Sequence, residues 1–387
     1  MFIGSKLQAL RELNGYSRKE LSEKLEVTEQ AIWQYETEST MPKSVTLQTI
    51  QEMFNVRPAF LMTGSAPSVV VHEANIAYRA KDRSSRKKTK MEASYLNFAD
   101  ALVTYFERFV TGDQTGFRTL YQKVQQIMPG ENTPARIRMI ANVVRQQMAL
   151  TDNRDLMAKV ERMGVYVVEK KFGEQIDAYS TITDSGRAWI VLGSEKKSAV
   201  RHNFDLAHEL GHLFLHTTLD FEILTVKEHK EIENEAHLFA AELLLPVESF
   251  TDDFSHLSRR SNPDAYLDMK QHYQVSITAM AMHARALGLM SYQELRYFFG
   301  QRTKKGYQTM EPLDDKLVPV RPGRLRALTA LLFDKHVLTV GALMHQLKIT
   351  PVFVTQLFAL DANFFDKYQR QSAVRKFDNV ILFPRRT

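Results

Sequence analysis

The chain of 387 residues contains no cysteine. This absence excludes disulfide bonds, thiolate-bound zinc, iron–sulfur clusters and thiol nucleophiles, so any metal must be bound by His, Asp or Glu. Long apolar runs are also missing. No segment approaches the roughly 20 residues that span a bilayer, and the first ten residues, MFIGSKLQAL, lack the apolar core of a signal peptide. We therefore expect no membrane contact and a cytoplasmic location.

The chain carries a small net charge of +6, and most of its length is electrically balanced. Residues 79–90, RAKDRSSRKKTK, hold seven bases and one acid, which accounts for the whole excess. A polar run without an apolar period is typical of a solvated linker, which can also contact phosphate groups. The remaining composition is that of ordinary globular domains, of which this length suggests two or three.

The pattern of hydrophobic residues predicts a multidomain, mainly α protein with a small β-sheet. We expect a domain of short helices over 1–66, the basic linker over 67–92, and a metallopeptidase-like α+β domain over 93–250. The last of these begins with a helical lead-in over 93–150. Its strands are expected at 165–170, 176–182 and 187–193, and its helices at 198–216 and 231–245. Residues 251–387 are predicted to form a helical C-terminal domain, and the final VILFPRRT can add one strand.

A His-Glu-x-x-His pattern lies in the first of these two helices, in AHELGHLFLH. Side chains four residues apart on a helix lie on one face, about 6 Å apart, so His208 and His212 can bind one Zn²⁺. Glu209 is rotated by about 100° from His208, where it can act as a general base on water. Gly211 thins the helix where a substrate or strand can approach. Two surface or core histidines without a metal are the alternative interpretation.

Zinc needs a third protein ligand, and the second helix, in EIENEAHLFAAELLLP, offers two carboxylates. On a helical wheel with Ile232 at zero, the apolar stripe centres near about 40°, Glu233 lies at about 100° and Glu235 at about 300°. Glu233 is therefore the predicted ligand and Glu235 the fallback. His216 continues the histidine series but rises about 12 Å along the helix from His208, too far to share one metal. We assign it a supporting or structural role.

These motifs resemble the ImmA/IrrE family of metallo-endopeptidases. The resemblance rests on R-x-x-F-x-x-A-H-E-x-G-H from residue 201, E-x-x-A-x-x-F-A from residue 233 and Leu-Leu-Pro at 244–246, and it covers residues 135–300. It implies Zn²⁺ bound by His208, His212 and Glu233, with Glu209 as base. Mn²⁺ and Fe²⁺ also suit these ligands. His237 stands where many members have Asn, and Asp205 where they have a small polar residue.

The N-terminal segment has helix-turn-helix spacing. Ser17 and Glu20 form a capping-box pattern, Leu21 and Leu25 face inward, and Ile32 and Tyr35 pack back after the turn. Residues 3–62 resemble the five-helix domain of phage-repressor (Xre-type) regulators, which implies a recognition helix from Thr28 to Glu36 in the major groove of double-stranded DNA. The predicted DNA contacts are Thr28, Glu29, Gln30, Trp33 and Gln34, of which the two glutamines suit adenine edges.

Two features of this segment are unusual for a DNA reader. Glu26 stands where many such domains have glycine in a turn with positive φ. Residues 1–66 carry seven bases and eight acids, whereas affinity for DNA comes largely from neutralising phosphates. Dimerisation, the basic linker or both would then be needed for binding. A small helical protein-interaction module is the alternative interpretation.

Residues 339–357 match residues 17–35 at a constant offset of 322. The match predicts a second helix-turn-helix-like unit, for which a packing or partner-binding role is favoured over DNA reading.

The leading hypothesis is a zinc-dependent endopeptidase joined to a DNA-binding domain, acting in transcription regulation and stress response. The resemblance implies that it cleaves a protein partner such as a repressor. Two other hypotheses remain open: a transcription regulator whose metal site is a sensor or remnant without proteolysis, and an antitoxin-like protein that binds a partner through its helical C-terminal part.

Overall fold

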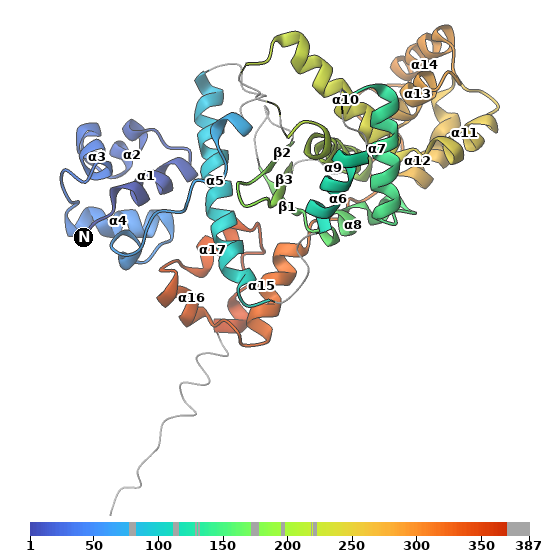
Figure 1. Cartoon of the computed structure of the whole chain (residues 1–387). Coiled ribbons are helices and arrows are strands. Elements are labelled where there is room, and N and C mark those ends of the chain that lie inside the picture. The colour runs from blue at the N-terminus through green and yellow to red at the C-terminus, as the bar shows by residue number, and fades with distance from the viewer. Residues whose placement is uncertain are drawn as a thin grey trace, which may run out of the picture. The chain divides into compact units, whose positions relative to one another are not determined.

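A computed structural model of the chain describes residues 1–76, 83–110, 116–127, 130, 132–171, 178–194, 198–217, 219 and 223–369. The chain forms two compact units, residues 1–112 with 325–387 and residues 113–324. Both are mainly helical, and the second also contains a small sheet (Figure 1). The mainly α, multidomain fold class predicted from the sequence is therefore confirmed. None of the described helices is long and apolar enough to cross a membrane.

The first unit combines short N-terminal helices, one long helix and a group of C-terminal helices. They are α1 (Gly4–Leu13), α2 (Arg18–Lys24), α3 (Glu29–Glu36), α4 (Ser44–Phe54), the 3-10 helices η1 (Pro58–Leu61) and η2 (Glu73–Asn75), α5 (Arg83–Glu107), α15 (Arg324–Asp334), α16 (Val340–Gln346) and α17 (Pro351–Leu357). The strand predicted for the last residues lies outside the described residues.

Helices α2 and α3 form the predicted helix-turn-helix. Ser17 and Glu20 complete the capping box that begins α2, and the Thr28 hydroxyl accepts a hydrogen bond from the Ala31 amide at the start of α3. Glu26, in the turn, has φ of +52°, the left-handed conformation that favours glycine. The four residues predicted to face inward are all buried, namely Leu21, Leu25, Ile32 and Tyr35.

The long helix α5 begins inside the segment predicted to be a basic linker. It runs without a break from Arg83 through residue 92, so residues 83–92 are helix rather than linker. Hydrogen bonds from the Ser94 hydroxyl to the Ala9 carbonyl, 3.0 Å, and from the Tyr95 hydroxyl to the Leu357 carbonyl, 2.6 Å, join α5 to both ends of the chain. This packing stabilises a helix whose basic first turns lack an apolar face, and it associates α5 with the first unit instead of the predicted peptidase domain.

Helices α16 and α17 repeat the arrangement of α2 and α3. The offset of 322 carries α2 onto Val340–Gln346, the bounds of α16. Thr339 and Thr350 cap the two helices through hydrogen bonds to backbone amides. Lys348, in the turn between them, has φ of +58°, the same left-handed conformation as in the first copy. The described chain thus contains a second helix-turn-helix-like unit.

Part of the face of α17 that corresponds to the reading face of α3 packs within the first unit. The Thr350 amide and hydroxyl both donate to the Asn55 carbonyl, at 3.1 and 2.8 Å. The Asn55 amide group donates to Gln356 at 3.4 Å. Pro351 and Thr355, which correspond to Glu29 and Trp33, are buried. The second copy therefore holds the end of α4, while Val352 and Gln356, which correspond to Gln30 and Gln34, are exposed.

The second unit contains a three-stranded sheet and the remaining helices. These are α6 (Gly116–Ile127), α7 (Pro134–Gln147), η4 (Asn153–Asp155), α8 (Leu156–Arg162), β1 (Tyr166–Lys170), β2 (Ala178–Ile182), β3 (Ala188–Gly193), α9 (Ala199–Leu215), α10 (Val226–Leu244), α11 (Val247–Ser255), η5 (Pro263–Tyr266), α12 (Leu267–Tyr273), α13 (Ile277–Ala286) and α14 (Tyr292–Lys304). The strand order is β1-β3-β2, with β1 parallel and β2 antiparallel to β3. Helix α9 packs on β2 and β3.

Residues 251–324 share one core with the sheet and with α9 and α10, so they do not form the separate domain predicted from residue 251. The shared buried cluster includes Leu206, Leu243, Phe254, Tyr266 and Phe298. The fully buried Lys270 ammonium lies 2.9 Å from the Glu311 carboxylate and 2.7 Å from that of Asp314. Asp314 also accepts a hydrogen bond from the Ser198 hydroxyl just before α9, at 3.1 Å. Long-range ion pairs of this kind leave no local pattern in the sequence.

The two left-handed turn residues predict a matched stabilisation. We expect Glu26→Gly and Lys348→Gly each to raise the free energy of unfolding of the first unit by about 0.5–1 kcal/mol, because glycine adopts positive φ without strain. Glu23→Gly, inside α2, should instead lower it by about 1 kcal/mol. Thermal unfolding of the full chain measures these effects. A loss of stability in both turn variants would contradict the shared turn geometry.

Candidate metal centre

The candidate site lies where α9 and α10 pack side by side (Figure 1). Helix α10 begins with a capping box made by Thr225 and Glu228 and ends just before Pro246. At the contact between the helices, a Cβ added to Gly211 would lie 3.0 Å from the Phe239 ring. The glycine therefore accommodates α10 and not, as the sequence suggested, a substrate or a strand. Close packing at this point brings the carboxylates of α10 within reach of the histidines of α9.

Three predicted ligands converge on one point. The Nε2 atoms of His208 and His212 lie 3.1 Å apart. The Glu233 carboxylate approaches both, with one oxygen 3.4 Å from Nε2 of His208 and the other 3.5 Å from Nε2 of His212. The two histidines are buried, while the Glu233 side chain is 33% exposed. The cluster is thus enclosed by protein on the side of α9 and reaches solvent through α10.

The donor set fits a single divalent cation. Ligand atoms bound tetrahedrally at about 2.0–2.1 Å from zinc are separated from one another by roughly 3.3 Å. The two Nε2 atoms lie 3.1 Å apart, and the two Glu233 oxygens lie 3.4 and 3.5 Å from them, one oxygen near each histidine, which is close to that value. Two imidazoles and a carboxylate also supply the nitrogen and oxygen donors that catalytic zinc sites use.

Burial favours the protonation state that a metal requires. It lowers the pKa of His212 to about 4, and the nearby Glu233 carboxylate only partly opposes this effect. The imidazole is therefore neutral at pH 7, and neutral imidazole is the form that binds metal ions.

Glu209, the residue after His208 on α9, contacts the sheet. The Ser180 hydroxyl on β2 lies 2.8 Å from a Glu209 carboxylate oxygen and 3.0 Å from the Glu209 carbonyl. Glu209 is fully buried. Ser180 was not predicted, because its contact with Glu209 depends on how β2 packs against α9. The serine ties the orientation of Glu209 to the sheet.

The fallback ligand Glu235 contacts a different histidine. Its carboxylate lies 2.8 Å from Nε2 of His216. The His216 Nδ1 atom in turn lies 3.0 Å from Nδ1 of His212. The different angular positions on α10 place the two carboxylates beside different histidines, whereas their burial is similar, since Glu235 is 26% exposed and Glu233 33%.

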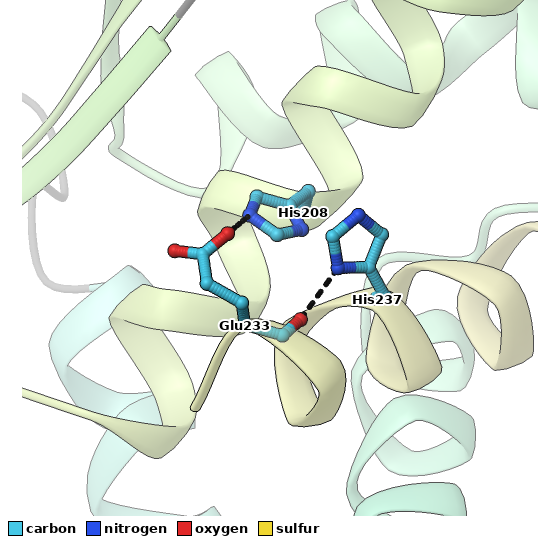
Figure 2. Close-up of side chains that lie close together, drawn as sticks. All are labelled: His208, Glu233 and His237. Carbon is cyan, nitrogen blue, oxygen red and sulfur yellow. Dashed lines mark hydrogen bonds and ion pairs between the residues drawn. The ribbon is translucent and has the colours of Figure 1, made fainter. Parts of the chain in front are cut away.

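His237, one turn after Glu233, lies at the edge of the cluster. Figure 2 shows it beside His208, with its Nδ1 atom 2.6 Å from the Glu233 main-chain carbonyl. The rings of His237 and His208 have centroids 4.5 Å apart. One donor atom each of His208, Glu233 and His237 lies within 4.8 Å of the others. A metal at this place has a fourth protein donor nearby.

The predicted DNA contacts lie on the surface of the helix-turn-helix. Thr28, Glu29 and Gln30 are exposed, Trp33 is 43% exposed, and Gln34 is half-buried. The Thr28 hydroxyl already caps α3, which reduces its freedom to contact a phosphate.

Comparison with known proteins agrees with this organisation. Residues 160–285 match the family model of the IrrE N-terminal-like domain, a metallopeptidase family, and residues 7–61 match a helix-turn-helix model. The two matches confirm the predicted combination of an Xre-type domain with an ImmA/IrrE-like domain. No curated protein matches the chain.

His283 predicts how the stability of this unit depends on pH. It lies 3.1 Å from the Leu245 carbonyl at the end of α10, and burial lowers its pKa to about 4 from 6.5. The unfolded state therefore binds more protons between these values. The contribution of His283 to the free energy of unfolding is fully present above pH 6.5. It falls by about 3 kcal/mol as the pH drops to about 4.

Denaturant unfolding of metal-free protein from pH 7 to pH 4 tests this expectation. His283→Gln, whose amide can still donate to Leu245, should flatten the decline but not remove it, because His212 titrates in the same window. An unchanged pH dependence in this variant would contradict the assignment.

Proposed function

We propose that the chain is a metal-dependent endopeptidase coupled to a DNA-binding domain, with zinc as the metal. One observation carries the proposal: the two imidazole nitrogens and the Glu233 carboxylate meet within 3.5 Å, with the carboxylate of Glu209 on the same helix. Only three protein donors from the predicted motif take part, and that number is typical of catalytic zinc sites. Manganese and iron also suit these donors.

His208, His212 and Glu233 would hold the ion. When bound, zinc supplies a Lewis acid that polarises a peptide carbonyl and activates water. Glu209 would take a proton from the attacking water and deliver it to the departing amine. The hydrogen bond from Ser180 to the Glu209 carboxylate favours one rotamer of this side chain, which would fix its orientation for this role. The buried surroundings of Glu209 also exclude bulk water from that oxygen.

The DNA-binding half of the proposal rests on α3 and on the charge beside it. Gln30 and Trp33 form an exposed stripe on α3, which suits insertion into the major groove. The first turns of α5 supply the positive charge that residues 1–66 lack, and Lys87 there contacts Glu20 at the start of α2 at 2.6 Å. The basic segment thus belongs to the same unit as the reading helix.

A domain that recognises DNA would bring the peptidase to proteins bound at the same operator. We therefore propose a repressor as the protein substrate, and a regulatory role in the cytoplasm, including the response to stress. Homodimerisation would double the contacts with DNA and compensate for the weak charge of one copy.

A second candidate function is a regulator whose metal site senses the ion without proteolysis. The position of His237 favours it, because a fourth protein donor would fill the coordination position that a hydrolytic site keeps open. In that case the spectrum of the Co²⁺-substituted protein would change in His237→Asn, whereas a hydrolytic site with three protein ligands would leave the spectrum unaltered.

The proteolytic proposal predicts a separation of metal binding from cleavage. Glu209→Gln should retain one equivalent of zinc but cleave a co-incubated repressor about 10²–10⁴-fold more slowly than the unaltered protein, because the general base is lost. Glu231→Gln, an exposed carboxylate on α10, is the matched control and should cleave normally. Gel analysis with and without a chelator measures the rates. Undiminished cleavage by Glu209→Gln would exclude this mechanism, and metal binding without any cleavage would favour the sensor.

The DNA-binding proposal predicts two different mutational effects. Gln30→Ala should cost about 1–3 kcal/mol at particular base positions, because it removes a base contact. Arg86→Ala on α5 should weaken binding equally for all DNA sequences. It should also reduce the slope of log binding constant against log salt concentration by about one. Fragments selected from a random DNA library serve as probes, and Gln48→Ala on α4 is the control. Failure of the unaltered protein to select any sequence would favour a protein-interaction module.

A further inference from the structure

His216 ends α9 as a fully buried residue between two polar groups. Its Nδ1 atom lies 3.0 Å from Nδ1 of His212, and its Nε2 atom 2.8 Å from the Glu235 carboxylate. The same carboxylate oxygen accepts a hydrogen bond from the Asn132 amide at 2.7 Å. A continuous chain of hydrogen bonds therefore runs from the segment before α7 to a predicted metal ligand.

With His216 in its neutral form, the hydrogen-bonding chemistry of these groups sets where the protons lie. A carboxylate only accepts hydrogen bonds, so Nε2 of His216 must be protonated and must donate the hydrogen bond to Glu235. The Nδ1 atom of neutral His216 is then an acceptor, and it accepts a hydrogen bond from the Nδ1–H group of His212. That leaves the lone pair of His212 on Nε2, the atom that faces His208 and Glu233.

We propose that Glu235 and His216 are positioning residues that hold His212 in its metal-binding tautomer. The inference rests on the proposed function, because it assigns a purpose to the tautomer only if a metal binds. The alternative tautomer of His212, with the proton on Nε2, would point an N–H at the cluster and exclude a cation. Glu235 disfavours this alternative tautomer through His216, without contacting His212 itself.

A hydrogen-bond partner that orients a ligating histidine typically contributes 10–100-fold to metal affinity. We therefore expect Glu235→Ala to weaken zinc binding by 10–100-fold, because His216 loses the acceptor that fixes its tautomer. Glu235→Gln retains a carbonyl acceptor and nearly the same shape, so it should restore part of the affinity. Glu231→Ala removes the same charge from an exposed position one turn earlier on α10 and should bind zinc normally.

Two measurements on the full chain test the proposal. Competition with a chromophoric chelator gives zinc affinity. Two-bond ¹H–¹⁵N correlation spectra of the metal-free protein report the tautomer of each histidine directly. If Glu235 had only a structural role, its substitution would leave these tautomers unchanged. We expect the Nδ1–H form for His212 and the Nε2–H form for His216 in the unaltered protein, with both disturbed in Glu235→Ala.

The outcomes separate this inference from the proposed function. An Nε2–H tautomer for His212 in the unaltered protein, or equal zinc affinity in Glu235→Ala, would overturn the positioning role even if the peptidase is active. Absence of zinc binding by the unaltered protein would instead refute the metal function, and the spectra would still decide whether the hydrogen-bonded chain has the proposed direction.

Discussion

The candidate site depends on how closely α9 and α10 approach each other. Gly211 allows this approach because any larger residue would meet the Phe239 ring. The approach places the Glu233 carboxylate beside His208 and His212 and the Glu235 carboxylate beside His216, just after α9. One packing contact therefore assembles both the proposed ligand set and the groups that orient it. Buried imidazoles are tolerated here because each has a specific polar partner.

The predicted positions of the site residues agree with the structure where they follow from helical periodicity. The spacing of His208 and His212 places them on one face, and the angle of Glu233 relative to the apolar stripe distinguishes it from Glu235. The sequence fails where contacts join distant elements. Ser180 on β2 contacts Glu209 on α9, 29 positions later in the sequence. The contact of Glu235 with His216 depends on how α9 and α10 are rotated relative to each other. Neither property is encoded in a local pattern.

The same distinction explains the domain boundaries. The helix-turn-helix and its C-terminal repeat follow from local caps and spacing, and the structure contains both, with matching left-handed residues at Glu26 and Lys348. The path of α5 and the attachment of residues 251–324 depend instead on tertiary contacts. Buried polar groups such as Lys270 require specific partners, and those partners, Glu311 and Asp314, lie 41 and 44 positions away.

Anomalous diffraction from zinc-soaked crystals, recorded at the zinc absorption edge, tests the central claim most directly. The account predicts one strong peak about 2.0–2.2 Å from Nε2 of His208, Nε2 of His212 and an oxygen of Glu233. A peak bound without His212, or zinc found only at other positions of a crystal in which these three side chains remain together, would contradict it.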